Sequence, residues 1–401
     1  MKILQKSNYT ISASDMRAIN RSAILELIRS DGPISQSSIG EQLKVSIPTV
    51  MRIVDNLRTE DLIKAAHLKE WSGGRKRSLI EFNGDQHLIV GVDLGGAKIF
   101  GAVADLNGKI LHETYINRHQ TCGEESYELL CKFVEDLLAF AGETKKSIKG
   151  IGIAVPGITH PEQGIVELAP ALEWVNFPLK QRLVDRFKLP TIVENDVNLS
   201  ALGELWFGKI RDIKNLVLIT IGTGIGAGIV INGMIYPGAH HMAGEIGYFV
   251  PDSSHFGKKY PGFGALEQYA SGTGIANRAR ILLKDQWPAG KLDNLTAEDV
   301  FSAAREHDSW AEEILSDTVD YLAQAIASVA LCVDPEVILL SGGVSRSADL
   351  LIEPILGKLT GIMPFLPLLE VSNLGYRAAV MGAIVQLLRM TSNYYLLHKF
   401  S

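Results

Sequence analysis

The strongest constraint on the fold of this chain is a glycine-rich pattern that occurs twice. Residues 88–117 read LIVGVDLGGAKIFGAVADLNGKILHETYIN, in which apolar stretches alternate with the turns LGGAK and DLNGK. Residues 216–238, LVLITIGTGIGAGIVINGMIYPG, repeat the order strand, glycine-rich turn, strand, Asn-Gly turn and strand. Helical stretches follow the two copies, at about residues 126–142 and 266–284. The duplication predicts two similar α/β lobes that face one another across a cleft, where ligands of such folds bind.

The glycine-rich turns themselves favour a phosphate-binding cleft. Backbone N–H groups in such turns form concave anion sites, and glycine lets the chain approach a phosphate closely. A third strand-to-glycine turn, LLSGGVS, spans residues 339–345, and Asp93 beside the first turn could hold Mg²⁺ through water. The chain has no GxxxxGK[ST] motif, and one glycine turn alone is more often structural, but three together favour a present or ancestral phosphate site. The predicted cofactor-binding residues are Asp93, Gly95, Gly96, Gly222, Thr223, Gly224, Gly226, Gly342 and Gly343.

Between the two copies, residues 191–208 read TIVENDVNLSALGELWFG, with Glu-Asn-Asp where a predicted strand turns into a helix. Side chains at such a point face the cleft, so Asn195 and Asp196 could bond to sugar hydroxyls. Asp196 could also accept a hydroxyl proton during phosphoryl transfer, a step that otherwise depends on positioning and electrostatics. A helix N-cap is the structural alternative for this pair, and it stays open.

A basic segment with the pattern of a helix-turn-helix precedes these lobes. Residues 1–82 hold 13 Lys and Arg against 9 Asp and Glu, a net charge of +4, whereas the whole chain carries −6. Apolar residues recur at helical spacing from Met16 to Ile28, and Ser35 and Ser46 are placed to cap two further short helices joined by a tight turn. Such a pair of helices, the second displaying polar residues, is the arrangement that enters the major groove of DNA.

A basic hairpin follows the third helix. Residues 62–68 and 78–82 are predicted to pair, and the loop SGGRKR at residues 72–77 has two glycines and three consecutive cations. Such a wing suits phosphates or the narrow minor groove of A·T-rich DNA. The alternative is a small helical cap with a basic loop, but a wing that directly follows the three predicted helices favours DNA binding. The predicted DNA-binding residues are Ser46, Pro48, Thr49, Arg52, Arg75, Lys76 and Arg77.

Length and composition limit the class of protein further. A chain of 401 residues is too long for one ordinary core and predicts two or three domains. No apolar run approaches the roughly 18–20 residues of a membrane span, and the N-terminal residues lack the apolar segment of a signal peptide. Cys122, Cys131 and Cys332 form no metal-binding spacing, which predicts reduced thiols and a cytoplasmic protein.

Together these segments resemble the ROK family, a group of repressors and sugar kinases with an actin-like ATPase fold. DLGGAK and GTGIGAG match the family's phosphate segments, VPG and ENDVNLSALGE its sugar segments, SGGV its adenosine segment and GYRAAVMGAI its closing helix. The resemblance implies that Asn195 binds the sugar and that Asp196 is the candidate catalytic base. AGEIG and LEQYASG imply that Glu245 and Glu267 bind sugar hydroxyls. Ala97, where kinases of the family usually have Thr, counts against efficient turnover.

The family's structural zinc site is the largest departure from this pattern. Its three cysteine positions hold Lys258, Tyr260 and Ala265, and its histidine position holds Tyr248, so zinc is not expected. Because that histidine also contacts the sugar, the resemblance implies that Tyr248 takes its place as a sugar-binding residue. We further expect Tyr260 and Phe263 to supply the packing that the metal otherwise provides.

Two smaller points concern the same region of the site. His240, His241 and His255 match no usual ligand spacing and are expected at the surface or in loops. Ala171 stands where many members have Asn, which removes one expected sugar contact.

The predicted architecture is an α/β body with duplicated actin-like ATPase (ribonuclease H-like) lobes, preceded by an all-α winged helix-turn-helix domain. The predicted boundaries are 1–84 for the head, 85–200 for lobe 1, completed by a C-terminal helix at about 376–401, and 201–375 for lobe 2. The implied function is a sugar-responsive repressor of carbohydrate-utilisation genes, which binds a double-stranded DNA operator as a homodimer or homotetramer. A small-molecule sugar is its effector, no membrane is involved, and repression needs no cofactor. The alternative is an ATP-dependent kinase for a hexose or N-acetylhexosamine, which would use ATP and Mg²⁺.

Overall fold

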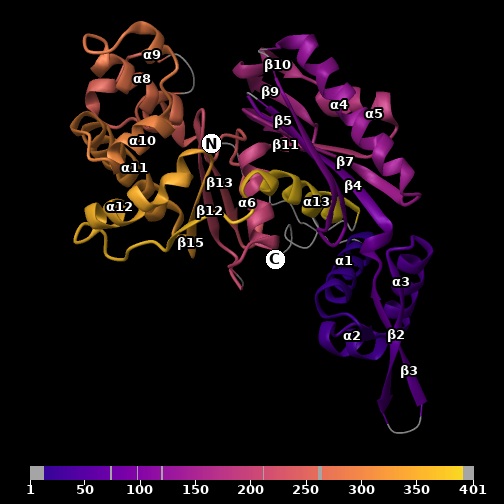
Figure 1. Ribbon diagram of the computed structural model, residues 1–401. Coiled ribbons are helices and arrows are strands. Elements are labelled where there is room, and N and C mark those ends of the chain that lie inside the picture. Colours follow the sequence, from indigo (N-terminus) through magenta and orange to yellow (C-terminus); the bar gives the residue numbers. More distant parts are fainter. Residues whose placement is uncertain are drawn as a thin grey trace, which may run out of the picture.

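The computed structural model describes residues 13–72, 75–96, 98–118, 121–210, 212–260 and 264–391. Figure 1 shows three parts, a head at the lower right, one lobe above it and a second lobe at the left. The head and the first lobe share one continuous apolar cluster, so the head is packed against the body.

The head combines three helices with a small sheet. Its elements are α1 (Ala13–Asp31), β1 (Ile34–Ser35), α2 (Gln36–Leu43), α3 (Ile47–Thr59), β2 (Ile63–Ser72) and β3 (Arg75–Phe82). Ser35 caps α2, as its sequence predicts, because its hydroxyl accepts a hydrogen bond of 3.2 Å from the backbone N–H of Ser38. Lys44, with φ of 54°, then turns the chain into α3, whose apolar residues at the predicted spacing are all buried.

Two features of the head differ from the prediction. Its strands form a three-stranded antiparallel sheet in the order β1-β3-β2, so the head is mixed rather than all-α. The cations Arg75 to Arg77 belong to strand β3, where the backbone of Arg77 pairs with Glu70, and not to the loop at the tip. The hairpin is longer than predicted because polar and charged residues can occupy a two-stranded ribbon whose faces need no apolar alternation.

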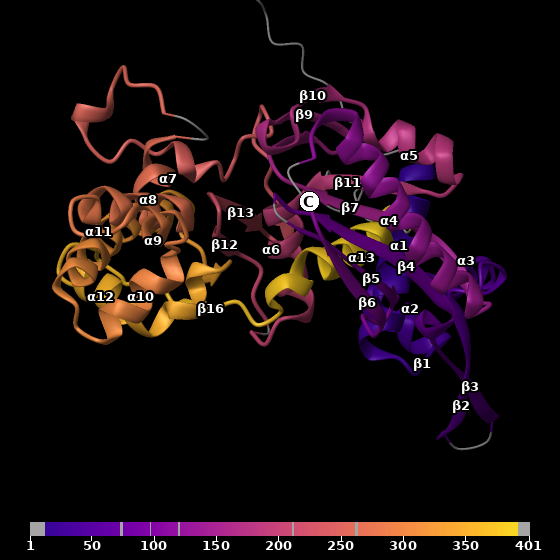
Figure 2. The ribbon, with the colours of Figure 1, turned by 45° about the horizontal axis from the view of Figure 1, so that its top comes forward.

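Lobe 1 is built on a five-stranded sheet in the order β11-β7-β4-β5-β6. Its strands are β4 (His87–Leu94), β5 (Lys98–Asp105), β6 (Ile110–Asn117), β7 (Ser147–Val155) and β11 (Thr191–Asn195). Helices α4 (Gly123–Glu143) and α5 (Leu179–Phe187) lie on the side of this sheet that faces away from the head (Figure 2). A separate small sheet of β8 (Ile158–His160), β9 (Ile165–Ala169) and β10 (Trp174–Phe177) extends the lobe.

Lobe 2 repeats the same sheet topology. Its strands, in the order β14-β13-β12-β15-β16, are β12 (Leu216–Ile221), β13 (Ile225–Ile231), β14 (Met234–Ile235), β15 (Val337–Ser341) and β16 (Leu369–Val371). Each sheet joins an antiparallel meander of three strands to two parallel strands. The predicted duplication of the two glycine-rich segments is therefore present in the fold.

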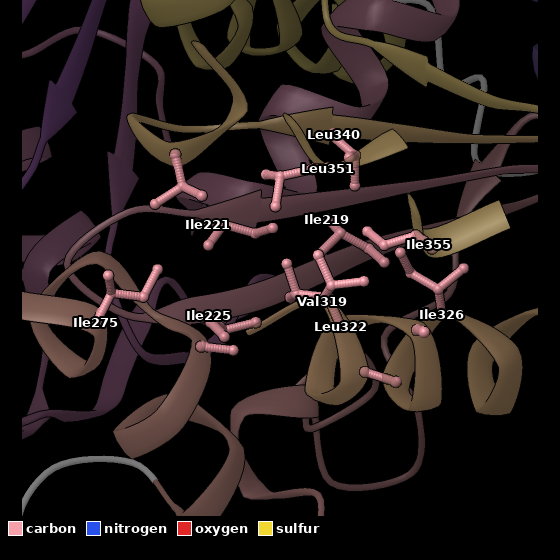
Figure 3. Packing of buried hydrophobic residues seen from close by; sticks show 14 of the residues in the cluster. Ile219, Ile221, Ile225, Ile275, Val319, Leu322, Ile326, Leu340, Leu351 and Ile355 are labelled. Atoms are coloured by element: carbon pink, nitrogen blue, oxygen red, sulfur yellow. The ribbon is translucent and has the colours of Figure 1, made fainter. Parts of the chain in front are cut away.

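The helices of lobe 2 cover one face of its sheet. They are α7 (Ala265–Ala270), α8 (Gly272–Leu283), α9 (Ala289–Asp293), α10 (Ala297–Arg305), α11 (Ser309–Val333) and α12 (Ile352–Leu359). Figure 3 shows side chains of β12 meeting those of α11 in the buried core of this lobe. Helix α11 is long and apolar enough to cross a membrane by length and composition, but half of its most apolar stretch is buried inside the lobe, as in a core helix.

Helices α6 (Asp196–Phe207) and α13 (Ala378–Thr391) lie between the two lobes. Helix α13 packs against the lobe 1 sheet, and α6 packs against α13 on one side and the lobe 2 strands β12 and β13 on the other. The two helices touch backbone to backbone, since a Cβ at Gly203 would lie 2.2 Å from the carbonyl oxygen of Ala378 and one at Gly382 would lie 1.8 Å from that of Leu199. This tight layer makes α6 a stiff connection through the centre of the molecule.

Candidate functional site

Three cavities with shared wall residues lie at the cleft: two are lined by residues of both lobes, and the third lies beside them within lobe 2. The acidic cavity, about 260 Å³, contains Asp196, Glu245 and Glu267 in its wall. The bridging cavity, about 450 Å³, contains Asp93 and shares Asp196 with the acidic cavity. The arginine cavity, about 590 Å³, shares Gly343 and Arg346 with the bridging cavity and also contains Arg280 and Arg305. Neighbouring cavities therefore share wall residues, so groups bound in two of them would lie next to each other.

Asn195 is both the N-cap of α6 and part of the wall of the acidic cavity. Its side-chain oxygen accepts hydrogen bonds from the backbone N–H groups of Val197 and Asn198, at 2.9 and 3.0 Å. Its side-chain nitrogen donates to the carbonyl oxygen of Gly157 at 2.9 Å. The N-cap alternative is thus present in the structure, and one amide hydrogen of Asn195 is left to face a ligand.

Asp196 and Asp93 meet at the junction of the acidic and bridging cavities. Asp93 ends strand β4, whereas Asp196 begins α6, and both line the bridging cavity. Burial raises the pKa of both carboxyl groups, and the charge of Asp93 raises that of Asp196 further. Among the described residues, no hydrogen-bond partner reaches the buried Oδ1 atom of Asp93. An unpaired buried carboxylate oxygen of this kind fits a site for a cation or a donor group of a ligand.

Glu245 and Glu267 provide the remaining carboxylates of the acidic cavity. Glu267, on α7, is nearly buried, and its Oε2 atom accepts a hydrogen bond of 3.1 Å from the backbone N–H of Ile225. Glu245 precedes the short helix η3 (Ile246–Tyr248). Burial, followed by the charges of Asp196 and Glu267, raises the pKa of Glu245 to about 7. Hydroxyl groups of a ligand would relieve this clustering of acids, because each can donate a hydrogen bond to a carboxylate.

Tyr248 does not line the acidic cavity, although Glu245 does. The Tyr248 side chain is 42% exposed. Its pKa is raised by burial and by the nearby charges of Glu245 and Glu267, so it lies close to the acids without facing the cavity. Ala171, by contrast, is part of the cavity wall, and its carbonyl oxygen accepts a hydrogen bond of 2.6 Å from Nη2 of Arg118.

Of the three histidines expected at the surface or in loops, His240 and His241 lie in the loop between β14 and η3, whereas His255 is buried. His255, in the short helix η4 (Ser253–His255), is buried, where its ring bonds to the hydroxyl of Tyr260 and meets Tyr269 edge to face. His241 lines the acidic cavity, and only His240 is fully exposed. The loop position of His240 and His241 is as expected, whereas the burial of His255 was missed because the spacing of the histidines does not report tertiary burial.

The residues at the family's zinc positions form no metal site. Among the described parts of the chain, no group of three or more His, Cys, Asp or Glu residues is arranged to hold a metal ion. The contact of Tyr260 with His255 is the kind of packing expected in place of the metal, whereas Phe263 lies outside the described residues. Ala97 also lies outside them.

The predicted phosphate-binding glycines fall into two groups. A Cβ at Gly224 would lie 2.5 Å from Oε2 of Glu267, and one at Gly342, where φ is +87°, would lie 2.4 Å from the carbonyl oxygen of Ile221. At Gly342 the backbone itself requires glycine, whereas a side chain at Gly224 would displace the carboxylate of Glu267. A Cβ at Gly96, Gly222 or Gly343 would have no heavy atom within 4 Å, so these glycines face open space in or beside the cavities.

The remaining predicted cofactor residues lie around the same turns. Thr223 lines both the acidic and the arginine cavities, and Gly226 lines the acidic cavity. Gly95 follows strand β4 and lines none of the three cavities. The structure therefore brings most of these residues to the cleft from two lobes.

Sequence reasoning missed the arginine cavity. Its arginines come from α8, α10 and η5 (Val344–Leu350), and Phe301 of α10 contributes an apolar wall. Arg280 bonds to the carbonyl oxygen of Leu292 at 3.0 Å, and Arg305 forms a bidentate pair with Asp349. No motif marks these residues, because they converge only when three separate helices pack together.

The outer face of α3 displays the predicted DNA-binding residues of the head. Ser46, Pro48 and Arg52 are exposed, and Thr49 is half-buried. The hydroxyl groups of Ser46 and Thr49 bond to one another at 2.9 Å, and the side chain of Ser46 does not cap the backbone of α3. The side chains of Arg75, Lys76 and Arg77 lie outside the described structure.

The far end of α6 meets the head, lobe 2 and α13 at one junction. The guanidinium carbon of Arg29, on head helix α1, lies 4.4 Å from the ring centroid of Trp206, and that of Arg389, on α13, lies 5.4 Å from it. Arg389 also donates a hydrogen bond of 2.7 Å to the carbonyl oxygen of Gly233, in the turn between β13 and β14. Two residues before Trp206, Oε1 of the buried Glu204 accepts a hydrogen bond of 2.7 Å from the backbone N–H of Leu374. Helix α6 thus begins at the acidic cavity and ends where the head, lobe 2 and α13 meet.

Two family models match the chain. The ROK family matches residues 89–389, and the winged helix-turn-helix DNA-binding family matches residues 17–64.

Individual relatives include both regulators and kinases. A xylose repressor from Caldicellulosiruptor bescii is 30% identical over 389 residues, which cover 93% of this chain and 96% of the repressor. A glucokinase from Halalkalibacterium halodurans is 39% identical over 278 residues, which cover 66% of this chain and 83% of the kinase.

Solved structures similar to this chain also include both a regulator and a kinase. A ROK family transcriptional regulator, described as a homologue of the E. coli MLC protein, matches with a TM-score of 0.83 at 25% identity, covering 96% of this chain and 99% of the regulator. A ROK family glucokinase from Streptomyces griseus, in complex with glucose and AMPPNP, matches with a TM-score of 0.64 at 29% identity, covering 75% of this chain and 98% of the kinase. The regulators match nearly the whole chain, whereas the kinases leave a quarter to a third of it uncovered.

Proposed function

This chain belongs to the ROK family, and on that premise we propose that it is a sugar-responsive transcriptional repressor of carbohydrate-utilisation genes. A sugar bound in the acidic cavity changes the affinity of the winged head for operator DNA. The observation that carries this proposal is the course of α6, which begins at Asp196 in the cavity and places Trp206, in its last turn, against the head. A kinase that acts alone has no use for such a head, and the relatives that match the full chain are named as a repressor and a regulator.

The coupling between cavity and head rests on the stiffness of α6. Its 12 residues span about 18 Å at the usual rise of an α-helix, and its backbone contact with α13 leaves no room for bending. A sugar shifts the molecule only if it binds one lobe arrangement better than the other. When the lobes close on a sugar, α6 moves as a unit and carries the junction at Trp206 with it, which changes the position of the head.

The chemistry of the acidic cavity favours a neutral sugar as the effector. Among the described residues that line it, three carry carboxyl groups and none is Lys or Arg. A sugar phosphate or a uronic acid would meet repulsion there, whereas the hydroxyls of a neutral sugar donate hydrogen bonds to carboxylates. We assign hydroxyl binding to Asn195, Asp196, Glu245 and Glu267, and we keep Tyr248 only as a residue that borders the site.

The head supplies the contact with DNA. The exposed face of α3, with Ser46, Pro48, Thr49 and Arg52, enters the major groove, and the cations of the hairpin contact phosphates or the minor groove. Two heads are needed to read a pseudo-palindromic operator, so we propose that the protein acts as a homodimer, or as a homotetramer of two such pairs. Its DNA and its sugar effector meet in the cytoplasm.

ATP-dependent phosphorylation of the bound sugar is the second candidate function. Its support is the position of Asp196, which lines both the acidic and the bridging cavity, where a sugar hydroxyl and a phosphate would meet. The chain's residues fit the nucleotide and its metal: the unpartnered Oδ1 atom of Asp93 would hold Mg²⁺, the open turns at Gly222 and Gly343 would hold phosphates, and the arginine cavity would hold the adenosine. Bound ATP would supply the phosphoryl group, and Asp196 would orient the hydroxyl and take its proton.

Two measurements separate the functions. Fluorescence anisotropy on DNA from upstream of the protein's own gene, with D-xylose, D-glucose and N-acetylglucosamine in turn, tests repression. We expect tight binding and a change of at least several-fold with one of these sugars, and no binding to any A·T-rich palindrome in that DNA would refute the proposal. Release of ADP with the same sugars tests catalysis, with Asp196→Asn as the control; equal rates for both proteins would exclude Asp196 as the base.

A further inference from the structure

Two histidines from opposite lobes meet beside the acidic cavity. His160 ends strand β8 of lobe 1, and His241 lies in the loop of lobe 2 between β14 and η3. Their ring centroids are 4.4 Å apart, with an angle of 45° between the ring planes. This contact bridges the cleft between two parts of the chain that are 81 residues apart in sequence.

The backbone holds His241 in place at the cavity wall. Its φ is 53°, in the left-handed region that L-amino acids rarely adopt, although histidine enters it more readily than most. Such a conformation persists only where the surrounding structure requires it. Here it directs the imidazole of His241 into the wall of the acidic cavity, beside residues that include Gly157 and Glu245.

Each of the two rings has one buried nitrogen whose hydrogen-bonding capacity is unused. Among the described residues, neither Nδ1 of His160 nor Nδ1 of His241 has a hydrogen-bond partner. The side-chain nitrogen of Gln163 lies 3.1 Å from Nε2 of His160, and because an amide nitrogen only donates, the neutral His160 ring carries its proton on Nδ1. Unsatisfied buried polar atoms are rare, and a bound group that satisfies them gains affinity.

We propose that His241, braced by His160, is a specificity-determining residue that limits the acidic cavity to a single sugar ring. Its imidazole forms a hydrogen bond with one hydroxyl of the bound monosaccharide, and the pair of rings occupies the space that a second sugar ring would need. The cavity volume of about 260 Å³ agrees with this limit, because pockets for drug-sized ligands usually measure about 300–1,000 Å³. The inference rests on the proposed sugar-binding function and narrows its ligand to a free monosaccharide.

Isothermal titration calorimetry with three pairs of sugars tests this inference. The pairs are D-xylose and xylobiose, D-glucose and cellobiose, and N-acetylglucosamine and chitobiose. We expect the unaltered protein to bind one monosaccharide and to reject its disaccharide. His241→Ala should weaken monosaccharide binding by about 2- to 12-fold, the effect of one hydrogen bond, and should admit the disaccharide. His160→Ala should change the affinities for the monosaccharide and the disaccharide in the same way as His241→Ala does, but by a smaller factor.

His240→Ala is the matched control, because His240 is the exposed neighbour in the same loop. It should leave both affinities unchanged, and equal thermal unfolding of the three variants would show that each is folded. Unchanged affinities and unchanged rejection of the disaccharide in His241→Ala would overturn the inference while leaving the sugar-binding function intact. An identical effect of His240→Ala would also overturn it. Failure of the unaltered protein to bind any of the six sugars would instead count against the proposed function.

Discussion

Arg29 of the head and Trp206 of the interlobe helix α6 form a cation–π contact, with the guanidinium carbon 4.4 Å from the ring centroid. Arg389 of α13 approaches the same ring at 5.4 Å. The indole is therefore shared by a cation of the head and a cation of the body. A movement of α6 changes the distance to both, which makes Trp206 the point at which sugar binding is expected to reach the head.

Trp206→Ala should uncouple sugar from DNA. A cation–π contact stabilises by about 0.5–2 kcal/mol, and allosteric coupling energies are about 1–3 kcal/mol, so loss of this contact should remove most of the sugar effect. We expect the operator Kd to differ by less than about 3-fold with and without sugar, while each ligand alone still binds. Anisotropy titrations measure this, and Trp287→Ala in lobe 2 is the matched control. A full sugar response in Trp206→Ala would contradict the role of the junction.

Sugar affinity should rise with pH between pH 6 and pH 8. The pKa of Glu245 is raised to about 7, and the ionised carboxylate is the better acceptor for sugar hydroxyls, so binding requires loss of a proton. The ionised fraction of such a group rises about tenfold over this interval, and the affinity should follow it. Glu245→Gln should bind the sugar more weakly and with a smaller pH dependence. Calorimetry at the two pH values tests this, and an affinity that falls with rising pH would contradict it.

The carboxyl group of Glu245 should also destabilise the sugar-free protein in alkaline solution. Its pKa in the folded protein is raised above the ordinary value of 4.5, so the stability present below pH 4.5 is lost as the pH rises through about 7. At pH 8 the loss amounts to at most about 3 kcal/mol. Glu245→Gln should therefore raise the Tm at pH 8 and have little effect at pH 5. Glu162→Gln, at an exposed site, should change neither value; a lower Tm for Glu245→Gln at pH 8 would refute the prediction.

Gly224→Ala should impair sugar binding through Glu267. The new Cβ would lie 2.5 Å from Oε2 of Glu267, which then has to move away from the acidic cavity and from the backbone N–H of Ile225. We expect at least about a tenfold loss of sugar affinity, because a charge-assisted hydrogen bond contributes about 1.5–3 kcal/mol. Gly290→Ala, where a Cβ meets nothing within 4 Å, is the control for a glycine substitution. Equal sugar affinities of the two variants would show that Glu267 does not bind the sugar.

Arg52→Ala should weaken operator binding without affecting sugar binding. Arg52 is exposed on the outer face of α3, where an arginine that reads a base contributes about 1–3 kcal/mol. Arg58, in the last turn of the same helix and paired with Asp55, provides the matched control as Arg58→Ala. Anisotropy measured over a range of salt concentrations checks the result. A greater loss with Arg58→Ala than with Arg52→Ala would mean that α3 enters the groove in a different orientation.

Most of the local structure was predictable because it follows from short-range patterns. The glycine-rich meanders, the strand that ends at Asn195 and the cap of α2 at Ser35 all depend on residues a few positions apart. The capping role of Asn195 was named as an alternative, and the structure combines it with a place in the cavity wall. The proposed domain boundaries and the assignment of ligand roles to single residues stay predictions.

The predictions that failed concern how deeply a side chain is buried and which element or surface it belongs to. His255 was expected at the surface or in a loop but is buried, and the hairpin cations were expected in a loop but belong to strand β3. The assignment of Tyr248 to the sugar site stays a prediction, because the residue lies near Glu245 and Glu267 but is not among those that line the acidic cavity. The spacing of residues along a chain indicates which side chains share one face of a helix or strand, but it does not indicate what packs against that face.

By itself the sequence determined the duplicated lobes, the winged head and the acids of the cleft, because backbone propensity, turn chemistry and apolar periodicity act over short distances. Only the tertiary structure decided that Asp93 and Asp196 share one cavity, that His160 and His241 meet across the cleft, and that α6 joins the sugar site to the head. These relationships arise when layers of helices and sheets pack to exclude water. That packing brings together residues far apart in the chain, which no local pattern relates.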